Sequence, residues 1–562
     1  MLFPKRQILP WAACLLAVVL AASRSWICDD AYICFRYAEN LVRGWGLVFN
    51  QGERVEGFTN LSWTLFSALG LLLGFSPERW TQAGGLLAFA GTLVLLTHRS
   101  GDRPTLAIQG NPIPVAVIVA MSMVHFLDFA TGGLETSAFT FLALAGYHAL
   151  FPPAGTAPTE RRAALGGLLL AIACLTRPDG MIFTTVLLAA LAVLRRGRGL
   201  VFAALAFGVL WAPVTLWRVR YYGDFFPNTY YAKSAYLAWW SQGFVYVGLF
   251  IARYWPLALA APFSVWLLAK RKPPLAPMFV EACLVAAYAL YVARVGGDFM
   301  FGRLLIPVVP FLLLLFERGF HSIFANHRAP GLALLGAIVV MNLFSPVPSE
   351  ARGRGIVDER DFYVHEMPTW ATDMDRNGAI LRQFLQGTGA RICYFGSEAR
   401  LVYRSQVATA IECETGLTDR RIARQPIAVR GRIGHEKPAP LEYVLAERPV
   451  NFLFKLPWGP TALGLDRAVP EVPIRLGTVP ARVLTWQAPL METLKSRGVA
   501  MPDLPAQLDG FLEILPSLPP AEARRAFGGL RRLYFDHTRD PAREAAFRAA
   551  LDAPRRDTHE HP

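Results

Sequence analysis

Two adjacent aspartates, Asp29 and Asp30, follow directly on an apolar run from Ile8 to Trp26. The run is long enough to cross a bilayer, so the two carboxylates lie where a helix leaves the membrane. Charge at that depth is costly unless it is solvated or paired, which makes such residues functional candidates. One interpretation is a general base, or an electrostatic partner, for a hydroxyl group that reacts. The other is helix capping plus a salt bridge to Arg36; because one aspartate is enough for capping, the pair favours function.

Polar side chains that suit phosphate or sugar binding occur in other short segments rich in glycine and aromatic residues. Arg303 follows Gly296-Gly-Asp-Phe-Met300, and an arginine there can hold a phosphate through two hydrogen bonds. Arg177-Pro-Asp-Gly180 is equally well explained as an ion pair at a helix break. The candidates for phosphate or sugar binding before residue 346 are Arg36, Glu56, Arg177, Asp179, Asp224, Asn228, Lys233, Asp298 and Arg303.

Motifs of the common soluble enzyme classes are absent from the sequence. It has no P-loop, H-E-x-x-H, G-x-S-x-G or dinucleotide-binding fingerprint. Asp373-Met-Asp375 matches a D-x-D metal pattern, but so short a match is better explained as acidic surface. None of the seven cysteines has metal-site spacing. Clustered carboxylates would permit a divalent metal, so no cofactor is assigned and metal dependence stays open.

The composition indicates a membrane domain followed by a soluble one. Of the 562 residues, 54% are hydrophobic and 17% charged, and the apolar runs are more numerous than a soluble protein carries. These runs recur until about Pro346. The net charge of +14 is explained by Lys and Arg in short cytoplasmic loops. We expect no nucleic-acid partner, because the chain lacks a recognisable binding module or a single basic stripe.

The number of apolar runs between basic loops decides which runs cross the membrane. Basic clusters in the loops are cytoplasmic by the positive-inside rule. Three runs separate Lys5 and Arg6 from Arg99 and Arg103, which would put these two clusters on opposite sides. One run therefore does not cross, and the weakest, 61–75, is assigned to a helix at the outer interface. The candidate runs are 8–26, 61–75, 80–97, 112–130, 136–151, 163–176, 180–194, 199–219, 247–269, 277–294, 303–317 and 329–345.

The resulting topology has about eleven transmembrane helices. The N-terminus is cytoplasmic and the C-terminal domain extracytoplasmic. Every segment that combines acidic, aromatic and glycine residues then falls on the outer face, although the charge rule does not consider those residues. These segments are 29–80, Thr131-Gly-Gly-Leu-Glu135, Arg177-Pro-Asp-Gly180, 221–240 and 296–303.

The first outer loop, 27–79, is predicted to begin with an amphipathic helix on the membrane surface. We expect Asp29 or Asp30 at its N-cap and a turn at Asn50-Gln51-Gly52 after it. Its polar side contains Asp29, Arg36, Asn40 and Arg43, and its apolar stripe contains Ala31, Cys34, Phe35, Ala38, Leu41, Val42 and Trp45.

Three regions are predicted: an α-helical membrane domain over 1–345, an extracytoplasmic α/β domain over 346–554 and a disordered tail over 555–562. Strands are expected at 391–396 and 407–411, flanking a helix, and at 451–455 and 483–486. The range 521–553 is helical in composition, with a break at Asp540-Pro541. Cys393 and Cys413 form one disulfide if the domain is extracytoplasmic; two buried thiols are the alternative.

Several of these segments together resemble one family, the GT-C glycosyltransferases that use lipid-linked sugars, in particular the terminal β-(1→2)-arabinofuranosyltransferases. The first matching stretch is long and specific, and the matches extend from Asp29 to Lys437. The stretches are DDAYICFRYAENLVRGWGLVFNQGERVEGFTN, GGLETS, LTRPDG, YYGDFFPNTYYAK, VGGDFMFGRLLIP, GLTDRRIARQP and RIGHEK.

The resemblance implies a polyprenyl-phosphate sugar as donor and a cell-envelope glycan as acceptor on the outer face. It maps the catalytic acidic pair on Asp29 and Asp30. It also implies that four residues of the soluble domain reach the membrane site: Asp419, His435, Glu436 and Lys437. The family does not determine the sugar, although arabinofuranose is the sugar of its typical members.

Two other functions compete with the transferase. A transporter or flippase of lipid-linked glycans should carry ionisable residues within its spans and an internal helix repeat, whereas here the charges gather at the outer span ends. A ligase for preassembled glycans shares the site chemistry. Released polyprenyl phosphate and loss of activity in Asp29→Asn or Asp30→Asn variants would distinguish the transferase from the transporter.

Overall fold

The computed structural model describes residues 8–99, 106–108, 111–153, 159–257, 262, 266, 275–324, 326–396, 398–454 and 469–553. The chain forms two compact units. The first unit contains Met1–Leu47, Phe58–Pro368 and Arg430–Gly434. The second contains Val48–Gly57, Thr369–Val429 and His435–Pro562. The predicted tail, 555–562, lies outside the described residues.

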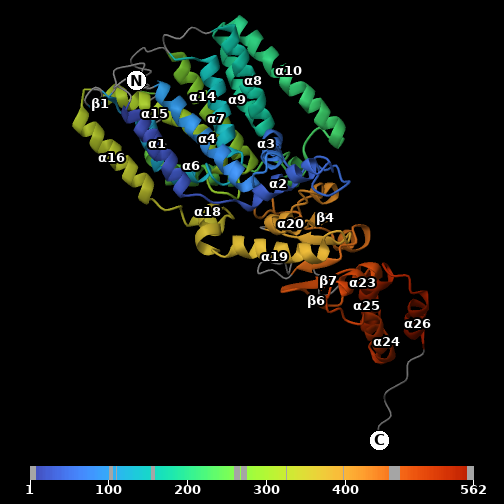
Figure 1. The fold of residues 1–562 in the computed structure, drawn as a ribbon. Helices are drawn as coiled ribbons and strands as arrows, with labels where there is room; N and C mark the ends of the chain where they lie inside the picture. Colours follow the sequence, from blue (N-terminus) through green and yellow to red (C-terminus); the bar gives the residue numbers. More distant parts are fainter. Residues whose placement is uncertain are drawn as a thin grey trace. The chain divides into compact units, whose positions relative to one another are not determined.

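The first unit is a bundle of apolar helices, and each predicted apolar run coincides with helix where it is described (Figure 1). The run 247–269 lies partly outside the described residues, and the run 112–130 is broken at Met123. The helices are α1 Ile8–Ser23, α4 Pro77–Arg99, α5 Val115–Ser122, α6 Val124–Asp128, α7 Thr136–Leu150, α8 Glu160–Thr176, α9 Gly180–Val193, α10 Gly197–Tyr222, α12 Trp240–Arg253, α14 Leu275–Val295, α15 Val309–Phe324 and α16 Arg328–Phe344.

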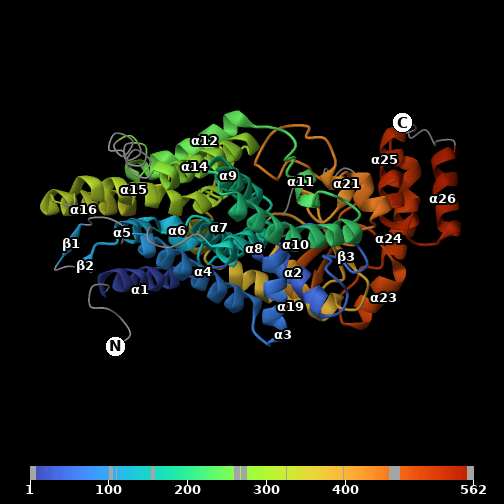
Figure 2. The ribbon, with the colours of Figure 1, turned by 90° about the horizontal axis from the view of Figure 1, so that it is seen from above.

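The bundle has the surface of a membrane protein. Helix α10 runs alongside α8 in the views of Figures 1 and 2, and its outward side chains are apolar, with Leu205 62% and Val209 74% exposed. Side chains of this kind are stable only against lipid or protein. Within the described residues, four helices are long and apolar enough to cross a membrane: Pro77–His98, Gly197–Tyr222, Pro277–Val295 and Arg303–Phe324. The count of eleven stays a prediction.

Two short helices, α2 (Asp29–Val42) and α3 (Leu61–Leu72), lie within 27–79, the predicted first outer loop. Helix α3 has twelve residues and extends about 18 Å, which is compatible with the predicted helix at the outer interface; that it does not cross the bilayer stays a prediction. The predicted N-cap of α2 is wrong: Cys28 caps the helix, and Asp29 and Asp30 are its first two residues. The reason is that the Cys28 N–H donates to Gly132 O at 3.0 Å, which holds Cys28 in an extended conformation.

Most of the predicted polar side of α2 does not face solvent, which also differs from the prediction; Arg43, the residue after the helix, is exposed. Asp29, Arg36 and Asn40 are 2%, 5% and 6% exposed. The helix is therefore buried on both sides, and its polar residues contribute to the interior of the protein. Helical spacing alone cannot distinguish a polar face in water from one covered by other polar groups.

The second unit is built on a mixed five-stranded sheet with the order β4-β3-β5-β7-β6. Its strands are β3 Arg391–Tyr394, β4 Thr409–Glu412, β5 Phe452–Phe454, β6 Val472–Leu476 and β7 Val479–Val483. Strand β3 pairs with β4 and β5 in parallel, whereas β7 pairs antiparallel with β5 and β6. Two helices, α19 (Trp370–Leu385) and α20 (Ala399–Ser405), pack against each other. The predicted strand–helix–strand unit is present.

The last predicted strand is misplaced, and β6 is missing from the prediction. Strand β7 ends at Val483, where the predicted strand 483–486 begins. Proline is unfavourable inside sheets, and Pro473 and Pro480 stand in β6 and β7. Pro480 is tolerated because β5 pairs only with Ala481–Val483.

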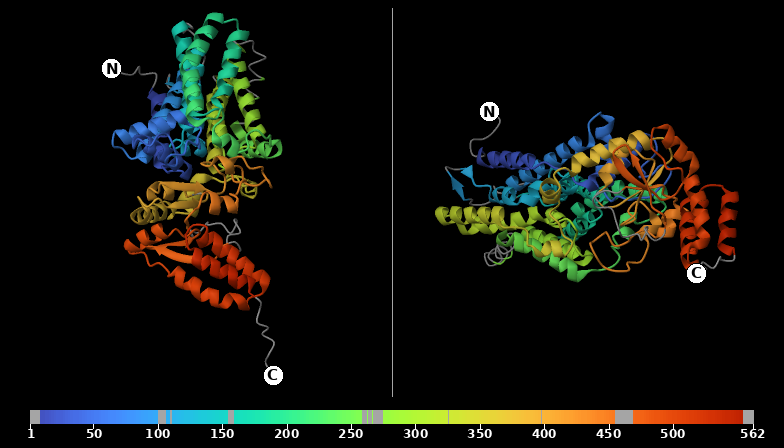
Figure 3. Two further views of the ribbon diagram at one scale, coloured as in Figure 1. Left: turned by 90° about the vertical axis from the view of Figure 1, so that its right-hand side faces the viewer. Right: turned by 90° about the horizontal axis from the view of Figure 1, so that it is seen from below.

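The C-terminal helices are α23 Ala488–Ser496, α24 Leu504–Ile514, α25 Pro520–Leu530 and α26 Pro541–Asp552, drawn in red in Figure 3. The predicted break at Asp540-Pro541 is present. Asp540 caps α26 by accepting the Arg543 N–H at 3.2 Å, and Pro541 follows as the first helical residue. Proline is favoured there because its missing N–H would have no partner.

Val48–Gly57, between α2 and α3, belongs to the second unit. The Asn50 side chain accepts from Ala410 N at 2.9 Å and donates to Ala410 O at 3.1 Å, so it extends the sheet beyond β4. Glu53 forms an ion pair with Arg448 at 2.7 Å. The predicted turn is present, with Gly52 at φ +78°.

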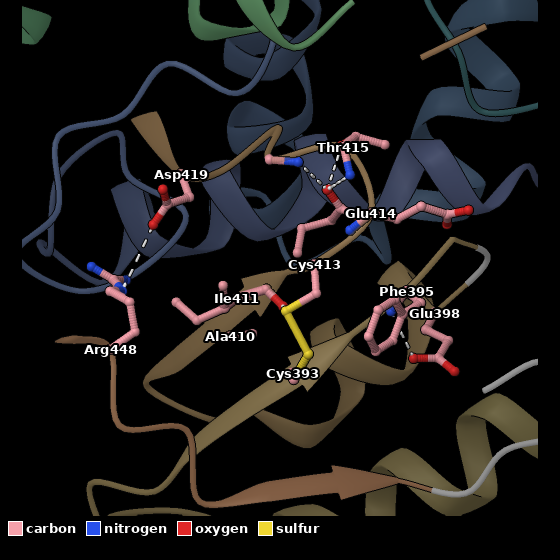
Figure 4. Close-up of a disulfide and its surroundings, with 12 residues drawn as sticks. Cys393, Phe395, Glu398, Ala410, Ile411, Cys413, Glu414, Thr415, Asp419 and Arg448 are labelled. Atoms are coloured by element: carbon pink, nitrogen blue, oxygen red, sulfur yellow. Dashed lines mark hydrogen bonds and ion pairs between the residues drawn. A yellow bond between two sulfur atoms is a disulfide. The ribbon is translucent and has the colours of Figure 1, made fainter. Parts of the chain in front are cut away.

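A disulfide joins Cys393 of β3 to Cys413, one residue after β4 (Figure 4). The two strands are parallel neighbours, and their Cα atoms at these cysteines are 6.3 Å apart. Of the two alternatives that the sequence left open, the structure has the disulfide.

Candidate active site

Arg303 lies at the centre of a cluster of carboxylates in the first unit. It begins a short 3₁₀ helix, η3 (Arg303–Val308), after Gly302 in the left-handed conformation. Its guanidinium nitrogens lie 3.2 Å from Glu135, 3.8 Å from Asp30 and 3.8 Å from Asp298. The three carboxylates come from the start of α2, the start of α7 and the loop before η3. Three of the five predicted outer segments, 29–80, 131–135 and 296–303, therefore meet at one arginine.

Arg177 ties the turn between α8 and α9 to the same cluster. Its guanidinium donates to both oxygens of Asp179 at 3.0 Å and to Glu135 at 2.9 Å. The Tyr288 hydroxyl donates to Asp179. Burial raises the pKa of Glu135, but Arg303 and Arg177 outweigh burial and bring it down to about 2. Arg177 and Asp179 are thus bound to each other, as the ion-pair interpretation of this turn expects.

Asp30 differs from its neighbours because it is accessible. Its side chain is 35% exposed, whereas those of Glu135, Asp179 and Asp298 are 3%, 2% and 5% exposed. Burial of the carboxylate raises its pKa, and Arg303 and Lys233 oppose that shift. A carboxylate that is both accessible and less acidic than usual is suited to accept a proton from a bound hydroxyl.

Two further cations approach the cluster on one aromatic ring. Lys233 Nζ lies 5.8 Å and the Arg432 guanidinium 4.6 Å from the ring centroid of Phe299, the residue after Asp298. Both cations act on the pKa of Asp30. Cations are favoured over an aromatic face, and 40% of the Arg432 side chain is exposed.

Sequence reasoning missed two members of this group, Arg432 and Glu359. Glu359 is 4% exposed and lies 3.7 Å from Arg432. Arg432 stands in the RIGHEK stretch, from which sequence reasoning selected only His435, Glu436 and Lys437. Glu359 stands beyond the last apolar run, in the short helix α18 (Glu359–Asp361), and no spacing in the sequence points to it.

The remaining candidates of the first unit lie near the loops rather than at Arg303. Arg36 is buried in α2. Asp224 accepts from the Tyr231 hydroxyl at 3.0 Å. Asn228 is the first residue of α11 (Asn228–Ala232) and is 5% exposed. The contact with Tyr231 explains the position of Asp224 without a ligand.

The other candidates lie in the second unit. Asp419 caps α21 (Arg420–Ala423) and accepts from Tyr443 at 2.6 Å. Lys437 is 1% exposed and donates to Ala423 O at 2.5 Å. Glu56 and Glu436 are buried, and His435 is partly exposed. A contribution of Glu56, Asp419, His435, Glu436 and Lys437 to the site stays a prediction.

Metal binding has no geometric support in the described ranges. No group of three His, Cys, Asp or Glu side chains there is arranged to hold a metal ion. Metal dependence is therefore still open.

Comparison with solved structures identifies the fold. ArnT from Cupriavidus metallidurans, in a crystal structure bound to undecaprenyl phosphate, superposes with a TM-score of 0.53 over 80% of this chain and 96% of ArnT, at 14% identity. Its apo structure gives a TM-score of 0.54 over 85% and 97%, at 12% identity. The chain has the GT-C fold. This agrees with the fold that the sequence motifs led us to expect.

Comparison with curated sequences supports the same resemblance. The terminal beta-(1->2)-arabinofuranosyltransferase of Mycobacterium tuberculosis is 33% identical over 409 residues, which cover 62% of this chain and 65% of the relative. The enzyme of the same name from Corynebacterium glutamicum is 28% identical over 542 residues, 78% of this chain and 76% of the relative. No family model matches the chain. The expected relationship is confirmed, over slightly less than two thirds of the mycobacterial enzyme.

Proposed function

We propose that this protein is a membrane glycosyltransferase that moves a sugar from a polyprenyl-phosphate donor to a cell-envelope glycan on the outer face of the cytoplasmic membrane. The observation that carries the proposal is the accessible carboxylate of Asp30 beside Arg303, Lys233 and Arg432. The names of the relatives suggest arabinofuranose as the sugar, and the ligand of ArnT suggests a polyprenyl phosphate as the carrier.

In this proposal Asp30 acts as the general base. The acceptor hydroxyl gives its proton to Asp30, and its oxygen forms a bond to the anomeric carbon of the donor sugar. The bond from that carbon to the phosphate oxygen breaks, and the polyprenyl phosphate leaves with the electron pair. Its negative charge is stabilised by nearby cations, for which Arg303, Lys233 and Arg432 are placed.

Asp29 has a different role from Asp30 in the proposed reaction. Its side chain lies in the interior, since the residue is 2% exposed. A buried carboxylate beside Asp30 holds the local charge negative and orders the start of α2, but it cannot reach an acceptor without movement. We therefore assign proton transfer to Asp30 and a supporting role to Asp29.

The outer-face location rests on two features. The disulfide between Cys393 and Cys413 is of the kind that persists in oxidising compartments. Arg195 and Arg196 lie between α9 and α10, and Arg198 is the second residue of α10; the positive-inside rule assigns this basic cluster to the cytoplasm. Both features agree with a catalytic site and a second unit outside.

The test is to incubate the purified protein with a panel of polyprenyl-phosphate sugars and an arabinan acceptor, and to measure released polyprenyl phosphate. We expect turnover with at least one donor and a loss of about 10²–10⁴-fold in Asp30→Asn, the usual contribution of a general base. Glu39→Gln is the matched control, because Glu39 lies on the same helix and pairs with Arg43 at 2.6 Å. No turnover with any donor, or full activity of Asp30→Asn, would refute the proposal.

A further inference from the structure

Residues Arg430–Gly434 form a short loop that belongs to the first unit, although the chain on both sides of it belongs to the second. Within this loop the Arg430 guanidinium lies 4.7 Å from the ring centroid of Trp239, and Arg432 lies over Phe299. Gly434 has φ +77°, and a Cβ there would lie 3.6 Å from Lys233. The loop therefore brings Arg432 and Lys233 together beside Asp298.

Arg432 is placed to bind an anion. A Cβ on Gly355 would lie 3.4 Å from its side chain, so the backbone there approaches closely. The distance from its Nη2 to Glu359 Oε1 is 3.7 Å, longer than a hydrogen bond. With 40% of its side chain exposed, the guanidinium keeps donors for a phosphate, which arginine binds through two parallel hydrogen bonds.

Glu359 is held rigidly beside Arg432. Val357 exchanges backbone hydrogen bonds with Phe299 and Phe301, at 2.7 and 2.9 Å. Asp358 pairs with His125 at 3.0 Å, and Arg360 lies 3.4 Å from Asp128. Because residues on both sides are anchored, the backbone at Glu359 is held in place with its side chain buried beside Arg432. In the described part of the chain its Oε2 atom has no hydrogen-bond partner.

The charges that face Glu359 favour its neutral form. Burial raises the pKa of Glu359 to about 8, with contributions from Asp30, Asp298 and Asp29, while Arg432 opposes the shift. The ordinary value for this group is 4.5. On its own helix, Asp358 and Arg360 are engaged by His125 and Asp128. Glu359 thus carries a proton at neutral pH and loses it as pH rises through about 8.

We propose that Glu359 is a positioning residue that controls donor binding through Arg432. While Glu359 is protonated, Arg432 keeps its guanidinium available for the phosphate of the polyprenyl donor. When Glu359 is ionised, it pairs with Arg432 and adds a negative charge beside the site, so the donor phosphate is repelled. This proposal rests on the proposed function in one respect only, the identity of the bound anion as the phosphate of a polyprenyl donor.

The test measures binding of undecaprenyl phosphate to the purified full-length protein in detergent, from neutral pH to about pH 9. For the unchanged protein we expect the affinity to fall about ten-fold across this range, the effect of one charged hydrogen bond. In Glu359→Gln, which cannot ionise, that fall should vanish. A structural role alone would not remove a pH step, so a step retained in Glu359→Gln would overturn the proposal.

A second variant keeps the test decisive if Glu359→Gln does not fold. Arg432→Gln should weaken binding of the same probe at neutral pH by about ten-fold and also remove the pH step, because Glu359 then has no cation to withdraw. Unchanged affinity in Arg432→Gln would overturn the proposal. Turnover is measured separately: binding with the expected pH step but no sugar transfer would support this proposal while refuting the proposed function.

Discussion

At the scale of single residues, the site separates side chains that hold the protein together from those that can act on a substrate. Arg177 binds both oxygens of Asp179 through Nε and Nη2 and donates to Glu135 through Nη1. Asp30 lies 3.8 Å from the Arg303 guanidinium, and its side chain is partly exposed. Polar groups that are fully paired and buried stabilise a structure, whereas accessible ones bind ligands.

Replacing Arg177 tests this distinction. Arg177→Met would leave the buried carboxylates of Glu135 and Asp179 without a shared cation, and breaking such a pair costs about 3–5 kcal/mol. We expect a lower midpoint of thermal unfolding in detergent. Arg43→Met is the control, since Arg43 pairs with Glu39 near the surface and should cost less than about 1 kcal/mol. Wild-type stability with lost donor binding would show instead that Arg177 contacts substrate.

At the scale of elements, the disulfide secures the pair of parallel strands β3 and β4. The cysteines are 20 residues apart in sequence. A link that closes a loop of about this length lowers the entropy of the unfolded chain and so raises the free energy of unfolding by about 3 kcal/mol. The strands themselves are four residues long, so the backbone ladder that holds them together is short.

We expect Cys393→Ser with Cys413→Ser to reduce the free energy of unfolding of the second unit by about 2–4 kcal/mol. Denaturant unfolding, followed by hydrogen exchange in β3 and β4, measures the change. Cys283→Ser is the control because Cys283 is a free cysteine. If added reductant leaves the unchanged protein as stable as before, the disulfide does not contribute as expected.

At the scale of the whole molecule, the direction of the chain in the membrane is the main testable property. Ser76, between α3 and α4, and Arg198, in α10, are both exposed. Charge parity puts them on opposite sides of the membrane. We expect Ser76→Cys to react with a membrane-impermeant maleimide in intact cells and Arg198→Cys to react only after permeabilisation. Labelling of Arg198→Cys in intact cells would reverse the topology.

The helices and the family resemblance could be predicted from the sequence because both depend on local patterns. Each apolar run that the structure describes is helical, and the motif from Asp29 to Asn60 led to relatives that the comparisons confirm. Two local predictions were wrong, the N-cap of α2 and the strand at Val483. Both features depend on hydrogen-bond partners elsewhere in the chain, which a local pattern does not show.

Sequence alone placed Asp29 and Asp30 together, and only the tertiary structure distinguished them, because accessibility depends on what packs around each side chain. Likewise Glu359 and Arg432 meet Asp30 through the folding of segments that are hundreds of residues apart. Long-range electrostatics of this kind leaves no period or motif in a sequence. The sequence by itself therefore determined the membrane helices and the relatives, whereas the tertiary structure decided which charges share one site.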